Sequence, residues 1–223
     1  MRGSRHIRAA AALSDDSHGA RKRGRPPNAL PPGTDLRESL VEAAAAEIRE
    51  AGWFATSTSR IAQRAGLSSG VFYNYFRDKV DVLLAVYERW VLEEWTLIRQ
   101  VFGDQTISPR QRIHQLVPLL INHHATWSRL RHALIVLSRD DERVRAARMS
   151  SRTAQINAVV ELTGRRGSAK LRAAAALRLL MFEAVADSIA SSDTDAMGLD
   201  RRALCNELAA VLLALVDTNA KPT

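Results

Sequence analysis

Apolar residues recur every three or four positions along most of the chain, the spacing that gathers them on one face of an α-helix. Clusters of glycine, proline and serine interrupt the pattern and mark helix ends and turns. Helices are predicted over about 34–51, 58–65, 69–75, 79–102, 129–137, 141–163, 168–191 and 200–217, with a further helix that begins at Pro109 and is kinked at Pro118. The pattern therefore predicts an all-α protein.

The chain divides into three parts by composition. Residues 1–33 are rich in Arg, Ser, Gly and Pro, and we expect a disordered basic arm there. Residues 34–80 contain the three short N-terminal helices, and residues 81–223 form a larger helical body. Thr34 is expected to cap the first helix and Gly52 to end it.

The formal net charge of +8 is concentrated near the N-terminus. Residues 1–33 hold seven Arg or Lys against two Asp, and residues 53–80 hold four against one Asp. A basic arm followed by basic short helices favours a phosphate-bearing partner, although basic charge also serves solubility. Charge alone leaves both interpretations open.

Several classes of protein are disfavoured. The single cysteine, Cys205, excludes an intrachain disulfide and a cysteine metal cluster, and it fits a cytoplasmic location. No apolar stretch is long enough for a membrane span, and residues 1–13 lack the apolar block of a signal peptide. There is no nucleophile motif, no Gly-rich phosphate loop and no metal-ligand spacing, so we expect neither an enzyme nor a metal or cofactor.

The stretch from Thr56 to Leu83 predicts a helix-turn-helix, two short helices joined by a tight turn in which Gly66 takes a positive φ. Apolar residues at the right spacing are expected to form the shared core of the two helices: Ile61, Ala62, Leu67, Phe72 and Phe76. Tyr75 is assigned to the core as well. The opposite face of the second helix is then free to enter a DNA major groove.

That outward face carries side chains suited to reading DNA. Asn74 can pair with adenine through two hydrogen bonds, Val71 can contact a thymine methyl, and Ser69 lies beside them. Tyr73 can donate its hydroxyl to a phosphate, with packing as the alternative role. Further phosphate contacts are expected from two helix N-termini and a lysine: Ser57, Ser68 and Lys79.

The residue order from 61 to 79 is highly specific. It reads Ile61-Ala62-x-x-Ala65-Gly66-Leu67-Ser68-x-Gly70-x-Phe72-Tyr73-x-Tyr75-Phe76-x-x-Lys79. This run closely resembles the DNA-binding signature of TetR-type repressors, and the similarity covers about residues 36–84. The resemblance implies an N-terminal three-helix DNA-binding domain and a C-terminal helical domain for ligand binding and dimerisation. It also implies phosphate contacts by Ser57, Tyr73 and Lys79 and base reading by Ser69, Val71 and Asn74.

Four positions depart from that family's pattern. Thr58 stands where an apolar residue is usual, and Arg60 replaces a common acid that would complete a capping box. Glu47 and Ile48 replace a typical Leu-Phe pair. These departures concern the first two helices and leave the groove-facing helix intact.

The basic arm contains the run Arg21-Lys22-Arg23-Gly24-Arg25-Pro26-Pro27, which resembles an AT-hook core. Arg23 and Arg25 are expected to extend along a narrow A+T-rich minor groove, which attracts arginine electrostatically. A solvated tail without DNA contact is the alternative.

The last two predicted helices carry apolar stripes that the resemblance implies would pair with a second copy as a four-helix bundle. They comprise Leu171, Ala175, Phe182, Val185 and Ile189, then Leu204, Leu208, Val211, Leu212 and Leu215. Packing within one chain is the alternative. Either way, two reading heads on a homodimer would match a palindromic operator.

A small-molecule effector is expected in the body, in a mostly apolar pocket with a few polar groups. The residues proposed to line it are Trp95, His124, Trp127, Met149 and Phe182. The sequence thus predicts a cytoplasmic, nucleoid-associated bacterial transcription regulator, by family default a repressor that releases double-stranded operator DNA when ligand binds. The alternatives are a ligand-independent DNA-organising protein and, least favoured, a helical enzyme.

Overall fold

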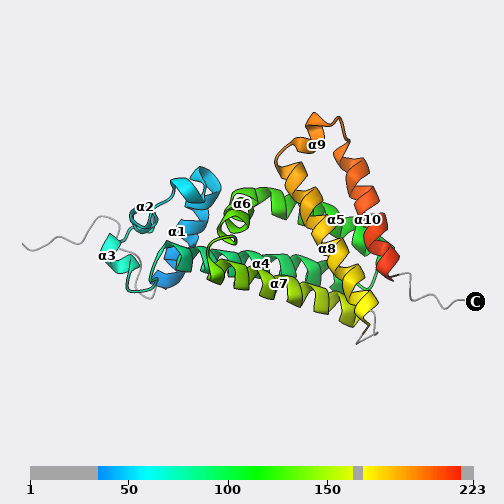
Figure 1. Ribbon diagram of the computed structural model, residues 1–223, viewed down its shortest axis with the longest axis horizontal. Helices are drawn as coiled ribbons and strands as arrows, with labels where there is room; N and C mark the ends of the chain where they lie inside the picture. The colour runs from blue at the N-terminus through cyan, green and yellow to red at the C-terminus, as the bar shows by residue number, and fades with distance from the viewer. Residues whose placement is uncertain (1–34, 163–167, 217–223) are drawn as a thin grey trace, which may run out of the picture.

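The computed structural model describes residues 35–162 and 168–216, and throughout these ranges it confirms an all-α protein (Figure 1). The helices are α1 (Leu36–Ala51), η1 (Trp53–Ala55), α2 (Thr58–Arg64), α3 (Ser69–Phe72), α4 (Lys79–Gly103), α5 (Pro109–Thr126), α6 (Ser128–Leu137), α7 (Glu142–Leu162), α8 (Ala169–Ala190), α9 (Asp193–Ala196) and α10 (Arg201–Val216). The short helices η1 and α9 were not predicted from the sequence. The arm of residues 1–33, with Arg23 and Arg25, lies outside the described residues.

Helix α1 begins one residue later than predicted, because Asp35 and not Thr34 is its cap. The Asp35 carboxylate accepts hydrogen bonds from the backbone N–H groups of Arg37 and Glu38 at 2.9 and 3.3 Å. A carboxylate satisfies the free N–H groups of the first turn and also complements the positive end of the helix dipole. Gly52 ends the helix as predicted, with a φ of 85° that favours glycine.

Helix α5 begins where Pro109 predicted. Ser108 caps it in a capping box: its hydroxyl accepts from the Gln111 N–H, and the Gln111 side chain accepts from the Ser108 N–H. The helix continues through Pro118 to Thr126. Proline within a helix removes one backbone hydrogen bond.

The small helices α1–α3 form a head at one end of the long helix α4 (Figure 1). A first buried cluster joins this head to the N-terminal half of α4 and to α6, where Leu40 and Ile48 share a core with Trp127 and Leu130. A second cluster holds α5, α8 and α10 together at the far end of the body. Helix α4 therefore belongs to both parts and connects them.

Arginines of the body reinforce this junction. Arg129 of α6 donates to the carbonyls of Arg49 and Glu50 at the C-terminal end of α1. Arg143 of α7 donates to Asp78 and Asp81 at the start of α4, each at 3.0 Å. Both ends of the head are thus fastened to the body. None of the helices in the described ranges has the length and apolarity to cross a bilayer.

Candidate nucleic-acid interface and body cavity

Helices α2 and α3 form the predicted helix-turn-helix. Gly66 has a φ of 71°, and the Leu67 N–H donates to the Ala62 carbonyl at 2.8 Å, which closes the turn. Ile61, Ala62 and Phe72 are fully buried, which confirms them as the shared core. Leu67 is only partly buried against that core.

Helix α3 is shorter than the predicted range of 69–75 and ends at Phe72. The next residues continue as turns, in which the Asn74 N–H donates to the Val71 carbonyl and the Tyr75 N–H to the Phe72 carbonyl, both at 3.1 Å. These bonds span three residues, the tighter winding common at helix ends. Tyr73 and Asn74 therefore lie on a turn that extends the helix.

Most of the residues of the head that were predicted to face DNA are exposed. Tyr73 is 58% exposed, Ser57, Ser68, Ser69 and Asn74 are exposed, and Val71 is half-buried. Tyr75 is 41% exposed, so its assignment to the core is wrong. Its ring follows the turn outward, while Phe72 and Phe76 fill the interior. We name the surface formed by residues 57, 58, 68, 69, 71, 73 and 74 the reading face.

Hydrogen bonds between side chains fix the reading face. The Tyr73 hydroxyl lies 3.2 Å from the Thr58 hydroxyl, and the Ser69 hydroxyl donates to Ser59 at 3.2 Å. Thr58, which departs from the family's apolar residue, thus orients Tyr73. Ser57 caps α2, because its hydroxyl accepts a hydrogen bond from the Arg60 N–H at 3.2 Å.

Lys79 is already engaged within the head. Its ammonium donates to the Trp53 carbonyl at 2.6 Å and lies 4.0 Å from the centre of the Trp53 ring. Burial lowers the pKa of Lys79 below its ordinary value. A phosphate bound by Lys79 would therefore replace, or be added to, its hydrogen bond with the Trp53 carbonyl. The phosphate contact of Lys79 stays a prediction.

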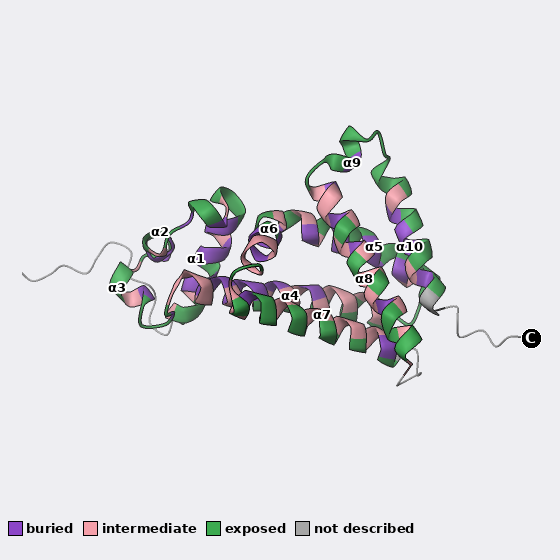
Figure 2. Cartoon of the chain, viewed as in Figure 1, coloured by how far each residue is buried: buried purple, intermediate pink, exposed green. Residues whose placement is uncertain are grey.

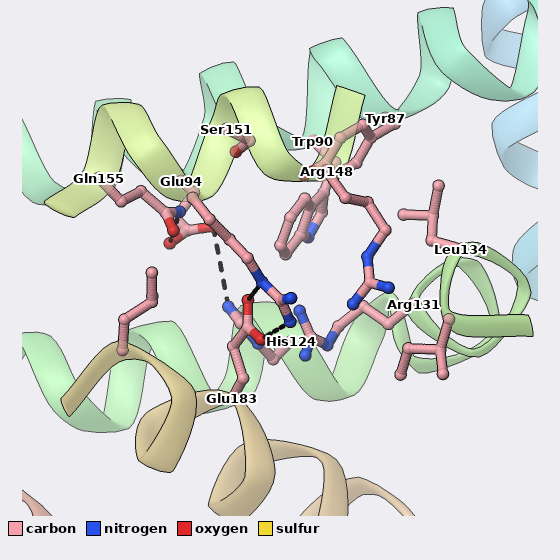
Figure 3. A pocket seen from close by; sticks show the side chains of 13 residues that line it. Tyr87, Trp90, Glu94, His124, Arg131, Leu134, Arg148, Ser151, Gln155 and Glu183 are labelled. Carbon is pink, nitrogen blue, oxygen red and sulfur yellow. Dashed lines mark hydrogen bonds and ion pairs between the residues drawn. The ribbon is translucent and has the colours of Figure 1, made fainter. Parts of the chain in front are cut away.

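A small cavity lies inside the body between α4, α5, α6, α7 and α8 (Figure 3). Its volume is about 20 Å³, enough for about one water molecule. Drug-sized ligands occupy sites of roughly 300–1,000 Å³, so a larger molecule would enter only if the lining side chains moved.

Of the residues predicted to line a ligand pocket, only His124 lines this cavity. Phe182 lies behind it, with its ring edge-on to His124 at 5.0 Å between centroids. Trp127 is buried in the first core cluster, with the guanidinium of Arg49 4.9 Å from its ring centre. Trp95 is half-buried and Met149 is 44% exposed, and neither borders the cavity.

The cavity is polar, whereas the sequence predicted a mostly apolar one. Arg131 of α6 binds Asp187 through two N–H groups at 2.6 and 2.9 Å, and Arg152 of α7 binds Glu183 in the same way. Although burial opposes it, the pKa of Arg131 is raised by these contacts with Asp187. The sequence contained a sign of this polar lining: charged residues share a helix face with aromatic residues, as Glu94 does with Trp90, four positions before it on α4.

Four polar atoms at the cavity have no hydrogen-bond partner among the residues that the structure describes. They are Trp90 Nε1, Glu94 Oε2 and both ring nitrogens of His124. Glu94 Oε1 accepts from Gln155 at 3.2 Å, but Oε2 lies 3.7 Å from His124 Nε2 (Figure 3). Buried polar groups are normally satisfied, so these atoms point to a partner that is polar itself.

In the described part of the chain, no three His, Cys, Asp or Glu side chains are grouped so that they could hold a metal ion. His123, adjacent to His124, stacks parallel to Trp90 with centroids 5.4 Å apart, and its Nε2 lies 3.2 Å from the Trp90 carbonyl. His123 therefore packs against Trp90, whereas His124 lines the cavity.

Comparison with known proteins agrees with the geometry of the head. Residues 40–86 match the model of the N-terminal region of bacterial regulatory proteins of the tetR family. The transcriptional regulator AcuR of Cereibacter sphaeroides is 33% identical over 92 residues, which are 41% of this chain and 42% of AcuR. The HTH-type transcriptional regulator BetI of Yersinia pestis is 32% identical over 81 residues, 36% of this chain and 41% of BetI. The chain matches less than half the length of these relatives.

Solved structures extend the likeness to the whole fold. A transcriptional regulator from Rhodococcus sp. superimposes with a TM-score of 0.64 at 17% identity, over 83% of this chain and 99% of that one. The fatty acid degradation regulator FadR from Bacillus halodurans superimposes with a TM-score of 0.57 at 19% identity, over 81% of this chain and 95% of that one. At such identity the likeness concerns the fold alone.

Proposed function

We propose that this chain is a DNA-binding transcriptional regulator of the TetR family, which binds a palindromic operator as a homodimer and releases it when a small molecule occupies the body cavity. The regulators of this family are transcription factors rather than enzymes. Repression is the family's usual mode, and in that mode the chain would act at the bacterial nucleoid.

The observation that carries the proposal is the reading face. It presents exposed hydroxyl and amide groups, including Tyr73 and Asn74, on a helix-turn-helix whose core residues Ile61, Ala62 and Phe72 are fully buried. Such groups bind phosphate oxygens and base edges. Packing within the described head does not explain why these hydroxyl and amide groups are exposed on the reading face.

A homodimer is supported by apolar residues that one chain leaves uncovered. Ala173, Leu177, Leu180 and Ala184 recur at helical spacing on α8, and all four are exposed. On α10, Ala210, Val211 and Ala214 are exposed too (Figure 2). This outward face of α8 is the dimer surface that we propose.

The stripes predicted from sequence for dimerisation lie mainly elsewhere. Phe182, Ile189 and Leu208 are buried in the second cluster of their own chain, so the intramolecular alternative holds for them. Val211 is the exposed member, at 38%. The side chain of Leu215 lies outside the described residues.

Helix α4 offers a route from effector to DNA. Trp90 and Glu94 border the cavity, and the same helix begins at Lys79 beside the head, where Arg143 holds its first turn. A shift of α4 would change the separation of two paired heads. That separation must match about 34–36 Å, one helical turn of DNA. A ligand that prefers the mismatched form by a few kcal/mol would release the operator.

The test is selection of duplexes from a random DNA pool by the purified protein, followed by footprinting against random competitor DNA. We expect one enriched, two-fold symmetric site with half-sites one helical turn apart. The double variant Tyr73→Ala/Asn74→Ala should lose this site. Broad A+T binding without a symmetric site would instead support a DNA-organising protein.

A further inference from the structure

Arg148 stands apart from the other arginines at the cavity. Within the described ranges it forms no ion pair, and the hydrogen bond of its guanidinium goes from Nη1 to the neutral Ser138 hydroxyl at 2.9 Å. The other two arginines each bind a carboxylate through two N–H groups. Burial lowers the pKa of Arg148, and the positive charge of Arg152 lowers it further, while the carboxylate of Glu183 opposes the shift without forming an ion pair.

Around the same cavity lie hydrogen-bonding atoms that remain unsatisfied. Trp90 Nε1 can only donate and Glu94 Oε2 can only accept, while neutral His124 offers one donor and one acceptor. Glu94 is 5% exposed and His124 only 2%. Figure 3 shows Glu94 and His124 facing each other while Arg148 extends from α7 into the same space.

A water molecule alone would not satisfy both the unpaired charge of Arg148 and the unsatisfied polar atoms of the cavity. The cavity of about 20 Å³ admits about one water, which forms two to four hydrogen bonds but carries no charge. Arg148 would remain a partly buried cation with no ion pair within the described ranges, an unfavourable arrangement. A small anion satisfies it, whereas a simple cation would approach a lining with three arginines and two glutamates.

We propose that the cavity binds a small carboxylate that also carries a hydrogen-bond donor. The carboxylate binds the guanidinium of Arg148 and the indole N–H of Trp90, and the donor, a hydroxyl for example, binds Glu94 Oε2. The flexible side chain of Arg148 moves to admit the ligand. This assignment rests on the proposed role of the cavity as the effector site and adds the chemical class of the effector.

The test compares three matched probes, lactate, propionate and propylene glycol, and the corresponding sets that are one and two carbons longer. Binding to the full-length protein is measured by calorimetry. Hydroxy acids should bind most tightly, simple acids more weakly and diols not at all. Diols that bind as well as the acids, or a complete absence of acid binding, would overturn the proposal.

Arg148→Met should weaken binding of the best hydroxy acid about tenfold to a hundredfold, and Arg148→Lys should be intermediate. The control is Arg145→Met on the same helix, because Arg145 is exposed and pairs with Glu142. It should bind like the parent. Equal affinity in Arg148→Met and parent would also refute the assignment.

Operator binding separates this proposal from the one on which it rests. Each variant is footprinted without acid, which also shows that it is folded. If the symmetric site is bound but no acid binds, the effector class is wrong and the regulator stands. If no symmetric site is found, the proposed function itself fails.

Discussion

Glu47 of α1 accepts a hydrogen bond from Arg60 of α2, with Glu47 Oε2 and Arg60 Nε 2.9 Å apart. Both residues depart from the family's usual pattern, and the structure explains them together. Arg64 donates to the other oxygen of the same carboxylate at 2.8 Å. Burial would raise the pKa of Glu47, but the hydrogen bonds from the two arginines outweigh it and hold the pKa below its ordinary value. An ion pair thus takes the place of an apolar contact between α1 and α2.

Removal of both arginines should destabilise the head. Arg60→Met/Arg64→Met leaves the Glu47 carboxylate, 5% exposed, without a counter-charge, and we expect a loss of at least about 2 kcal/mol in the free energy of unfolding. Urea denaturation followed by circular dichroism measures it. The triple variant that adds Glu47→Leu should return to within about 1 kcal/mol of the parent. A double variant as stable as the parent would contradict this account.

Substitutions on the reading face should separate base reading from phosphate binding. Asn74→Ala should cost about 1–3 kcal/mol at one base pair of each half-site and relax the preference there. Tyr73→Phe should weaken binding about fivefold for every sequence, because a phosphate contact is independent of base identity. Binding assays on operators with single base changes distinguish the two patterns. If Tyr73→Phe alters the base preference, Tyr73 reads a base rather than binding a phosphate.

The sequence predicted those features that depend on residues close together in the chain, and it predicted poorly those that depend on contacts between distant segments. The turn at Gly66 and the start of α5 at Pro109 depend on neighbouring residues, and both were predicted, whereas the capping box at Ser108 was not. Phe72 and Phe76 were assigned to the core by spacing and are buried there. The assignment of Tyr75 to the core was wrong, because α3 ends at Phe72 and the chain tightens into a turn.

The cavity was the least predictable part. Its polar lining comes from five helices, and the contacts of Arg131 with Asp187 and of Arg152 with Glu183 join residues 56 and 31 positions apart. Periodicity identifies which face of a helix is buried but not which faces meet. Trp127 and Met149 were assigned to a pocket because of the family resemblance, while the charged residues that border the cavity were overlooked.

Charge on the outward face of α8 should prevent dimerisation. Leu177 and Leu180 are 66% and 49% exposed in one chain, so their replacement disturbs little of its own core. Leu177→Glu/Leu180→Glu should shift the protein to a monomer in light scattering and lower operator affinity by at least about tenfold, since the second half-site no longer contributes. Leu92→Glu on α4, at a leucine 63% exposed, is the matched control and should remain dimeric. Dimers in the double variant would place the interface elsewhere.

His123 should make stability depend on pH near neutrality. Burial is the main cause that lowers its pKa below the ordinary value of 6.5, although its contact with the Trp90 carbonyl opposes this. The unfolded chain then binds a proton at higher pH than the folded chain does. The free energy of unfolding should therefore be greatest above pH 6.5, decrease as the pH falls below it, and level off below the folded pKa.

The measurement is urea denaturation at several pH values between about 7.5 and 5.5, a range above the ordinary pKa of most carboxylates. His123→Phe retains a flat ring against Trp90 but cannot take up a proton, so its stability should vary less over this range than that of the parent. His114→Phe is the control, because His114 lies on the same helix α5 but is exposed, and its replacement should leave the parent's pH dependence unchanged. If His123→Phe and the parent show the same dependence on pH, another group is responsible and the neutral, stacked state of His123 does not contribute to stability.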